Sequence, residues 1–179
     1  MKILLSLFLL GISFNSFCQH WILTPAGFRD SADSRKKYLM IEAGNLSAKK
    51  LYDNALKYIA ENKPDSSQRA RIKWDSVDII YDSFVFYLFT SDYLFHYGPV
   101  EAYYSTELRF YPGSVRYEIL SLDMVEINSG EKLVIKGSPI SSMSIYNKHD
   151  KLLKPEMKLK IEKYFNGELA ILAHFLNQQ

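Results

Sequence analysis

Hydrophobic and polar positions in residues 36–63 follow two different periods, one after the other. Residues 38–42 alternate between two faces, which predicts a short strand that ends at Gly44. Over residues 48–59 apolar side chains recur at spacings of three and four, the single stripe of an amphipathic helix. Ser47 can accept a hydrogen bond from the first turn of this helix, and Pro64 cannot continue it.

The next segment predicts strands with polar interruptions. Residues 71–81 read as one strand that is broken or bulged at Asp75-Ser76, and Asp82-Ser83 is expected to form a turn. Residues 84–89 (Phe-Val-Phe-Tyr-Leu-Phe) are apolar on both faces, which is typical of a strand that is covered on both sides or lines a cavity. Residues 91–99 are expected to connect this strand to the next one.

Residues 102–122 predict a hairpin that reverses at Pro112-Gly113. Proline presets φ for the first central position of a type II turn, and glycine supplies the positive φ of the second. This register places apolar residues opposite one another on one face, as the pairs Phe110–Val115, Leu108–Tyr117 and Thr106–Ile119.

The other face of this hairpin is charged. Arg109 lies opposite Arg116, and Glu107 lies opposite Glu118, so direct neighbours carry like charges. We expect the diagonal pairs Arg109–Glu118 and Glu107–Arg116 to compensate for this, on a face that is mostly in contact with water.

The last part of the chain predicts an edge strand and a long helix. Residues 132–135 interrupt a hydrophilic stretch and can add a strand at the sheet edge. The helix is expected over residues 155–178, because Pro155 suits the first helical position. Its buried stripe is predicted to be Met157, Ile161, Phe165, Leu169, Leu172 and Leu176.

These elements predict an α+β fold, a curved antiparallel sheet of about five strands with two helices on one face, in the order β-α-β-β-β-β-α. The block from Ser47-Ala48-Lys49-Lys50-Leu51-Tyr52 to Arg116-Tyr117-Glu118-Ile119 resembles a family of secreted bacterial domains of unknown function with a TBP-like fold. The resemblance covers residues 36–124, although Asp82-Ser83 stands where the family has a glycine between its two middle strands. It implies the fold and export, and it carries no activity.

The first eighteen residues have the layout of a secretory signal peptide. Lys2 precedes an apolar run that ends near Ile12, and cleavage after Cys18 would leave small residues, Ser16 and Cys18, at positions −3 and −1. We therefore expect export to a bacterial periplasm or cell surface, with Gln19 as the mature terminus and no transmembrane anchor. A lipoprotein modified at Cys18 and an uncleaved anchor are the alternatives, but the apolar run is shorter than the roughly 20 residues of a membrane span.

Three further expectations concern the mature chain. Residues 19–35 are predicted to be an irregular leader, and residues 36–179 a single domain. Cys18 is the only cysteine, so this domain would be held by its core without disulfides. Without Lys2, 21 basic side chains face 20 acidic ones, a balance that gives no sign of a nucleic-acid surface.

No catalytic, metal or cofactor motif is present in the sequence. The four histidines are not at metal-binding spacing, and no HExxH, GxSxG or SxxK pattern occurs. The unusual feature is aromatic content: 26 of the 179 residues are Phe, Tyr or Trp, and twelve lie between Tyr81 and Tyr111. These rings either fill the core or line a groove for a ligand.

The sequence therefore favours a non-enzymatic binding module that takes an envelope protein, a peptide or an apolar ligand on an aromatic sheet surface. A divergent hydrolase around His149 and His96, and a structural protein that pairs through a sheet edge, are the alternatives. The predicted surface consists of Phe84, Phe86, Tyr87, Phe89, Tyr103 and Tyr104.

Overall fold

The computed structural model describes residues 19–63, 67–72, 77–93, 96–137 and 143–178. Their strands form a two-stranded sheet and a larger sheet of seven strands. The two-stranded sheet consists of β1 (Trp21–Thr24) and β2 (Gly27–Asp30). The larger sheet has the order β4-β5-β6-β7-β8-β9, and β3 also pairs with β7. Its strands are β3 (Tyr38–Glu42), β4 (Ser67–Ile72), β5 (Val77–Tyr93), β6 (His96–Tyr111), β7 (Ser114–Glu126), β8 (Lys132–Gly137) and β9 (Ser144–Asn147).

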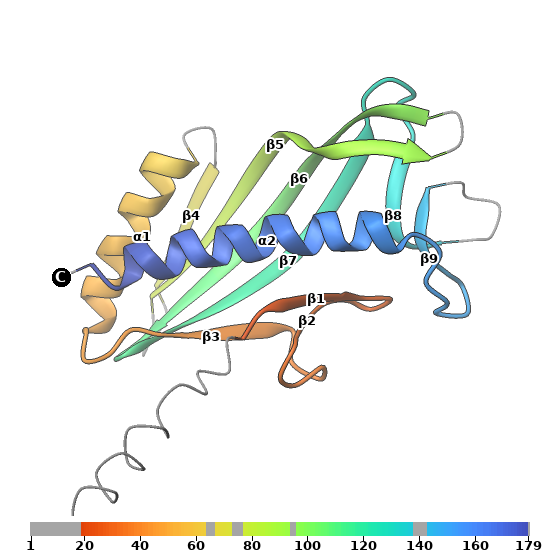
Figure 1. Cartoon of the computed structure of the whole chain (residues 1–179). Helices are drawn as coiled ribbons and strands as arrows, with labels where there is room; N and C mark the ends of the chain where they lie inside the picture. Colours follow the sequence, from red (N-terminus) through yellow and green to blue (C-terminus); the bar gives the residue numbers. More distant parts are fainter. Residues whose placement is uncertain (1–18, 64–66, 73–76, 94–95, 138–142, 179) are drawn as a thin grey trace, which may run out of the picture.

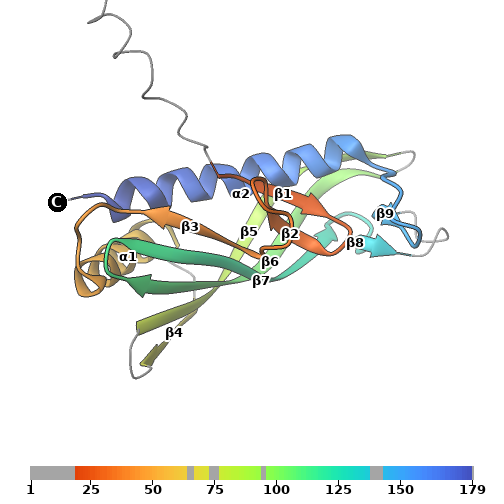
Figure 2. The same ribbon diagram turned by 90° about the horizontal axis from the view of Figure 1, so that it is seen from below.

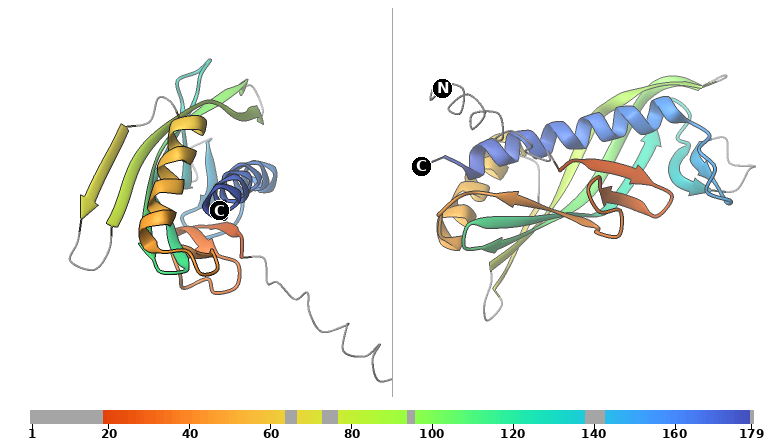
Figure 3. Two further views of the ribbon diagram at one scale, coloured as in Figure 1. Left: turned by 90° about the vertical axis from the view of Figure 1, so that its left-hand side faces the viewer. Right: turned by 60° about the horizontal axis from the view of Figure 1, so that its bottom comes forward.

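Two helices, α1 (Ala48–Asn62) and α2 (Pro155–Leu176), lie on the same face of the curved sheet (Figure 1; Figure 3, left). The predicted α+β fold with two helices on one face is thus confirmed, with more strands than the five expected. Within the predicted stripe of α2, five side chains are buried and Leu169 is partly buried; the five are Met157, Ile161, Phe165, Leu172 and Leu176.

The two elements with the strongest local signals form as predicted. Ser47 caps α1, and its hydroxyl accepts a hydrogen bond from the Lys50 N–H at 3.2 Å. The hairpin of β6 and β7 reverses at Pro112-Gly113 and has the predicted apolar register. Gly113 has φ +80°, and a Cβ atom there would lie 2.7 Å from the Gly44 carbonyl oxygen. The turn therefore needs glycine for its conformation and for the space.

The expected turn at Asp82-Ser83 is wrong, because β5 continues through it without a break. Asp82 lies opposite Ser105 on β6, and the Ser105 hydroxyl donates a hydrogen bond to its carboxylate. A polar pair is compatible with a strand when it lies on the sheet face that carries no helices. The composition of Asp82-Ser83 alone does not distinguish this case from a turn. β5 instead continues to Tyr93, which pairs with His96 at the start of β6.

The prediction for residues 132–135 is confirmed as a strand, β8, but β8 is not an edge of the sheet. The short strand β9 pairs with it in parallel, and the sequence analysis did not predict β9. The connection between them, residues 138–142, lies outside the described residues.

The expected irregular leader at residues 19–35 is also wrong. Trp21 and Leu23 of β1 are buried, and β1 lies alongside α2 (Figure 2). The Asn166 side chain accepts a hydrogen bond from the Trp21 N–H at 2.7 Å and donates one to the Trp21 carbonyl at 3.1 Å. Side chains of α2 thus satisfy backbone groups that β1 leaves unpaired on the side away from β2.

Two more side chains complete this attachment of β1. The Glu162 carboxylate accepts a hydrogen bond from the Leu23 N–H at 2.6 Å, and the Tyr146 hydroxyl donates one to the Leu23 carbonyl at 2.6 Å. A buried backbone group without a partner costs free energy. These side chains remove that cost and so stabilise the packing of β1 on the core.

Replacing Asn166 by leucine should lower the free energy of unfolding by about 1–3 kcal/mol, because both backbone groups of Trp21 lose their partner. Chemical denaturation measures the loss, and faster hydrogen exchange of the Trp21 and Leu23 amides would locate it. The control is Asn45→Leu at an exposed position, which should change stability by less than about 0.5 kcal/mol. Equal stability of the two variants would mean that the Asn166 side chain does not hold β1.

Candidate functional site: a groove between β5 and α2

A groove of about 570 Å³ lies where β5 passes beside the middle of α2. Strand residues Tyr87–Thr90 form one wall. The other wall is one side of α2, which presents Lys160, Lys163, Tyr164, Gly167, Glu168 and Ile171.

The strand wall is a part of β5 that has one open edge. β4 pairs only with Val77–Asp82, and in the described residues no strand pairs with the outer side of 83–93 (Figure 1). The pairing of β5 with β6 shifts register between Val85 and Phe89. An open edge presents N–H and C=O groups that no strand pairs with, and another extended chain can pair with them.

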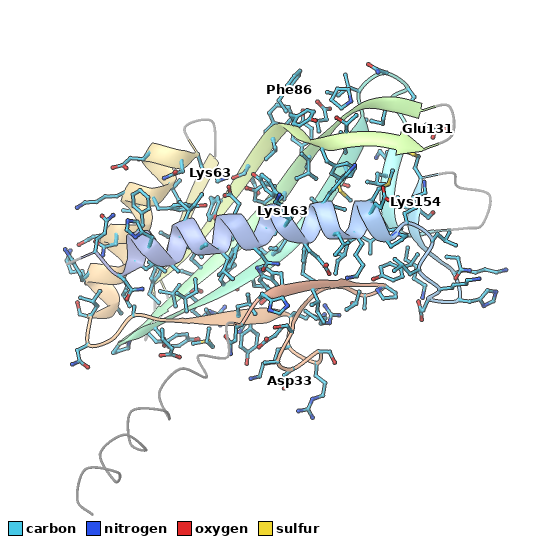
Figure 4. All side chains as sticks on the ribbon, viewed as in Figure 1. Asp33, Lys63, Phe86, Glu131, Lys154 and Lys163 are labelled. Atoms are coloured by element: carbon cyan, nitrogen blue, oxygen red, sulfur yellow. The ribbon has the colours of Figure 1, made fainter. Side chains whose placement is uncertain are left out.

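The walls combine apolar surface with positive charge. The Tyr87 side chain is 59% exposed, and that of Ile171 is 42% exposed. Lys160 Nζ donates a hydrogen bond to the Thr90 carbonyl at 3.1 Å and lies 5.7 Å from the centre of the Phe89 ring. Lys163 is exposed on the same side of α2 (Figure 4). The groove thus suits an occupant with apolar side chains and negative charge.

A buried ion pair lies below the groove and joins the two helices. Lys63, directly after α1, forms it with Glu168 of α2, and their side chains are only 10% and 15% exposed. Tyr58 donates a hydrogen bond to the Glu168 carboxylate at 2.8 Å. Burial lowers the pKa of Lys63, but the neighbouring Tyr104 and Glu168 outweigh it and raise that pKa above its usual value. Charged Lys63 and its partners therefore form a fixed floor.

The structure divides the predicted aromatic surface. Tyr87 and Phe89 line the groove, whereas Tyr104 is buried in the core under α2. Phe84 and Tyr103 stack on the sheet face opposite the helices, with ring centres 4.5 Å apart. Phe86 lies where the pairing of β5 with β6 shifts register, and its side chain is exposed and projects away from the sheet (Figure 4). The six residues do not form one surface.

The helix wall of the groove was not predicted from the sequence. Tyr164 and Ile171 do not belong to the predicted apolar stripe of α2, and Ile171 is exposed. Large apolar residues outside the stripe of an otherwise amphipathic helix are the signal that could have indicated a second contact surface on α2.

The charged face of the β6–β7 hairpin pairs differently from the prediction. Arg109 bonds to Glu107 on its own strand and to Asp78 of β5, and Arg116 bonds to Glu118 on its own strand. The predicted diagonal pairs are therefore wrong. These side chains are between 14% and 27% exposed, apart from Asp78, which is almost fully buried, so this face is also less wet than expected.

The hydrolase hypothesis gains no support from His149. His149 is exposed in the turn after β9, and only its backbone N–H has a hydrogen bond, to Asn147 Oδ1 at 2.9 Å. The side chain of His96 lies outside the described part. In the portion of the chain that the structure describes, no group of three or more His, Cys, Asp or Glu side chains could hold a metal ion.

Within the described part of the chain, no helix has the length and apolar character needed to cross a bilayer.

Comparisons with known proteins identify the fold. No protein-family model and no curated protein matches this sequence. Similar solved structures include a TBP-like protein from Parabacteroides distasonis, with TM-score 0.56, 11% identity and an alignment that covers 79% of this chain and 91% of that one. A DUF4468 family protein from Bacteroides ovatus has TM-score 0.52 and 14% identity, over 79% of this chain and 85% of that one. The resemblance to a bacterial domain of unknown function with a TBP-like fold is thereby confirmed.

Proposed function

We propose that this protein is an exported, non-enzymatic binding module that adds an extended peptide segment of a partner protein to the open edge of β5. The observation that carries the proposal is that the open edge and the groove coincide at Tyr87–Thr90. Backbone hydrogen bonds to a strand edge supply affinity, and pockets for alternate side chains supply specificity.

The geometry favours a peptide over an apolar small molecule or a lipid. An acyl chain would use the apolar walls, but it has no groups to pair with the N–H and C=O groups of the strand edge. A peptide strand pairs with the edge and directs every second side chain toward α2. These side chains would meet Tyr164 and Ile171, so apolar residues fit there.

Charge narrows the class of peptide further. Lys160 and Lys163 both border the groove, and Glu168 faces Lys63 below it. Carboxylates of the partner would therefore approach two ammonium groups near its rim. Complementary charge of this kind raises association rates and excludes partners of the wrong sign. The expected partner segment alternates apolar and acidic residues.

The test uses a short acetylated peptide that alternates valine with glutamate, and the mature chain from Gln19. Reversing both charges, with Lys160→Glu and Lys163→Glu, should weaken binding roughly tenfold or more by calorimetry, because attraction becomes repulsion. The matched control is Lys148→Glu with Lys151→Glu, two exposed lysines of the turn after β9. This control should retain the affinity to within about twofold.

Two further peptides separate the contribution of backbone pairing from that of charge. Methylation of alternate backbone nitrogens removes the N–H groups that pair with a strand edge, so this peptide should bind only weakly. A peptide with lysine in place of glutamate should also fail. Equal binding of all three peptides, or equal affinity of the two double variants, would contradict the proposal.

Export is tested on the protein from its native cell. Mass spectrometry of the envelope fraction should find a mature chain that begins at Gln19. Detection only in the cytoplasmic fraction with Lys2 retained would contradict export, and a lipid-modified Cys18 would identify the lipoprotein form instead.

A further inference from the structure

A second candidate site lies on the sheet face opposite the helices, and it is separate from the groove. Three strands present two rows of side chains there. One row is Asp82, Ser105 and Ser121, and the next is Phe84, Tyr103 and Asp123. The rows surround a depression of about 330 Å³.

The aromatic pair of this site is open to solvent. The rings of Phe84 and Tyr103 are inclined by 31°, and the two residues are 41% and 50% exposed. Because Phe84 covers one face of the Tyr103 ring, the opposite face is directed toward β7, where Asp123 is the cross-strand neighbour. A slot between a ring face and a carboxylate results.

The charge around this slot has one sign. The lining residues include two carboxylates, Asp82 and Asp123, and no basic side chain. Of the two carboxylates, Asp82 accepts a hydrogen bond from Ser105, and Asp123 is exposed. The arginines of the adjacent β6–β7 surface already pair with acids, Arg109 with Asp78 and Glu107, and Arg116 with Glu118. The slot therefore attracts cations and repels anions.

Shape selects among the possible cations. An aromatic face attracts a cation that lies within about 6 Å of its centre, and arginine does this more often than lysine. A guanidinium group is planar, so it can stack on the Tyr103 ring. Its N–H groups lie in its own plane and can then point outward at a neighbouring carboxylate. A carboxylate beside the stacked group can accept two parallel hydrogen bonds from it.

We propose that this outer-face site binds an arginine side chain of a partner protein, stacked on Tyr103 and paired with Asp123. The sheet here has no helix over it, and the site needs only one side chain from the partner. Because it lies on the face opposite α2, it can be occupied together with the groove.

The test compares two acetylated tripeptide amides, Gly-Arg-Gly and the same peptide with citrulline. Citrulline keeps the shape of arginine without its charge. In an NMR titration of the mature chain, the arginine peptide should shift the amide signals of Phe84, Tyr103 and Asp123. The citrulline peptide should bind roughly tenfold more weakly, and added salt should weaken the arginine peptide only.

Variants assign the contact to the proposed residues. Asp123→Asn keeps the shape and should weaken arginine binding about fivefold or more, and Tyr103→Leu should do the same through loss of the ring. Glu156→Gln, at an exposed position on α2, is the control and should leave affinity unchanged. All three positions are exposed, and unchanged dispersion of the remaining signals would verify folding.

Any of the following results would overturn the proposal. They are equal binding of the arginine and citrulline peptides, no effect of Asp123→Asn, and no shift at the site up to high millimolar peptide. A shift of the same signals by methyl glucoside but not by the arginine peptide would also overturn it, and would make the slot a sugar site.

Discussion

Truncating the chain after Lys154 should abolish folding of the remaining protein. The deletion removes α2, and with it five buried side chains, which are Met157, Ile161, Phe165, Leu172 and Leu176. Burial of a side chain of this size is worth about 1.5–3 kcal/mol, so the loss is comparable to the whole net stability of a typical domain, about 5–15 kcal/mol. Circular dichroism and a thermal melt of the truncated chain measure the outcome.

Polar contacts make this loss larger. α2 also supplies Asn166 and Glu162, which hold β1, and Glu168, which neutralises the buried Lys63. Removing one partner of a buried ion pair leaves an uncompensated charge, which is itself strongly destabilising. Leu159→Ala is the control, because Leu159 is on α2 but 62% exposed, and it should change stability by less than about 0.5 kcal/mol. A truncated chain that stays soluble with an unchanged melting temperature would show that α2 is an independent element.

The elements that could be predicted from the sequence are those whose signals lie within the element. The α1 helix has its stripe and its Ser47 cap within the same segment, and the β6–β7 turn has Pro112 and Gly113 side by side. The register of the hairpin follows from local geometry, because a turn of known length fixes the cross-strand pairs that follow it. This holds as far as Thr106–Ile119, beyond which the pairing shifts by one residue.

The elements that were missed depend on partners far away in the chain. β1 is stable because Asn166, 145 residues away, bonds to Trp21. Nothing near Trp21 in the sequence indicates this contact. The Asp82-Ser83 pair was interpreted as a turn for the same reason, because its polarity is explained only by Ser105 on the neighbouring strand.

The candidate sites show a similar limit. The apolar run at 84–89 predicted a strand that is covered on both sides or lines a cavity. Two of its residues, Tyr87 and Phe89, do line the groove. Alternation could not assign faces through this run, because the pairing with β6 shifts between Val85 and Phe89. A shift in register depends on the partner strand, so Phe86 and Tyr87 are both exposed although they are adjacent.

Raising the pH above about 10 should destabilise the protein, because several tyrosines are buried in its core. Tyr58, Tyr81 and Tyr117 are each no more than 2% exposed. Burial raises the pKa of all three above the usual value of 10.0. In the unfolded chain these phenols would ionise near their usual pKa, whereas in the folded protein they stay neutral.

The direction of the pH dependence follows from this difference in pKa between the folded and the unfolded state. The unfolded state releases protons first, so the stabilisation from these tyrosines is complete below about pH 10 and is lost as the pH rises beyond it. At about pH 11 each buried phenol should have lowered the free energy of unfolding by about 1.4 kcal/mol, and the three together by about 4 kcal/mol. Urea denaturation at about pH 8 and about pH 11 measures the difference, and the ultraviolet absorbance of tyrosinate should rise together with unfolding.

Two variants distinguish buried phenols from general alkaline effects. Tyr117→Phe removes one ionisable group from the core, so its stability should fall about 1.4 kcal/mol less between the two pH values than that of the unaltered protein. Leu159→Ala keeps every phenol and alters a 62% exposed residue, so its pH dependence should stay the same. If all tyrosines titrate in the folded protein near their usual pKa without loss of structure, then the core around Tyr58, Tyr81 and Tyr117 is open to water.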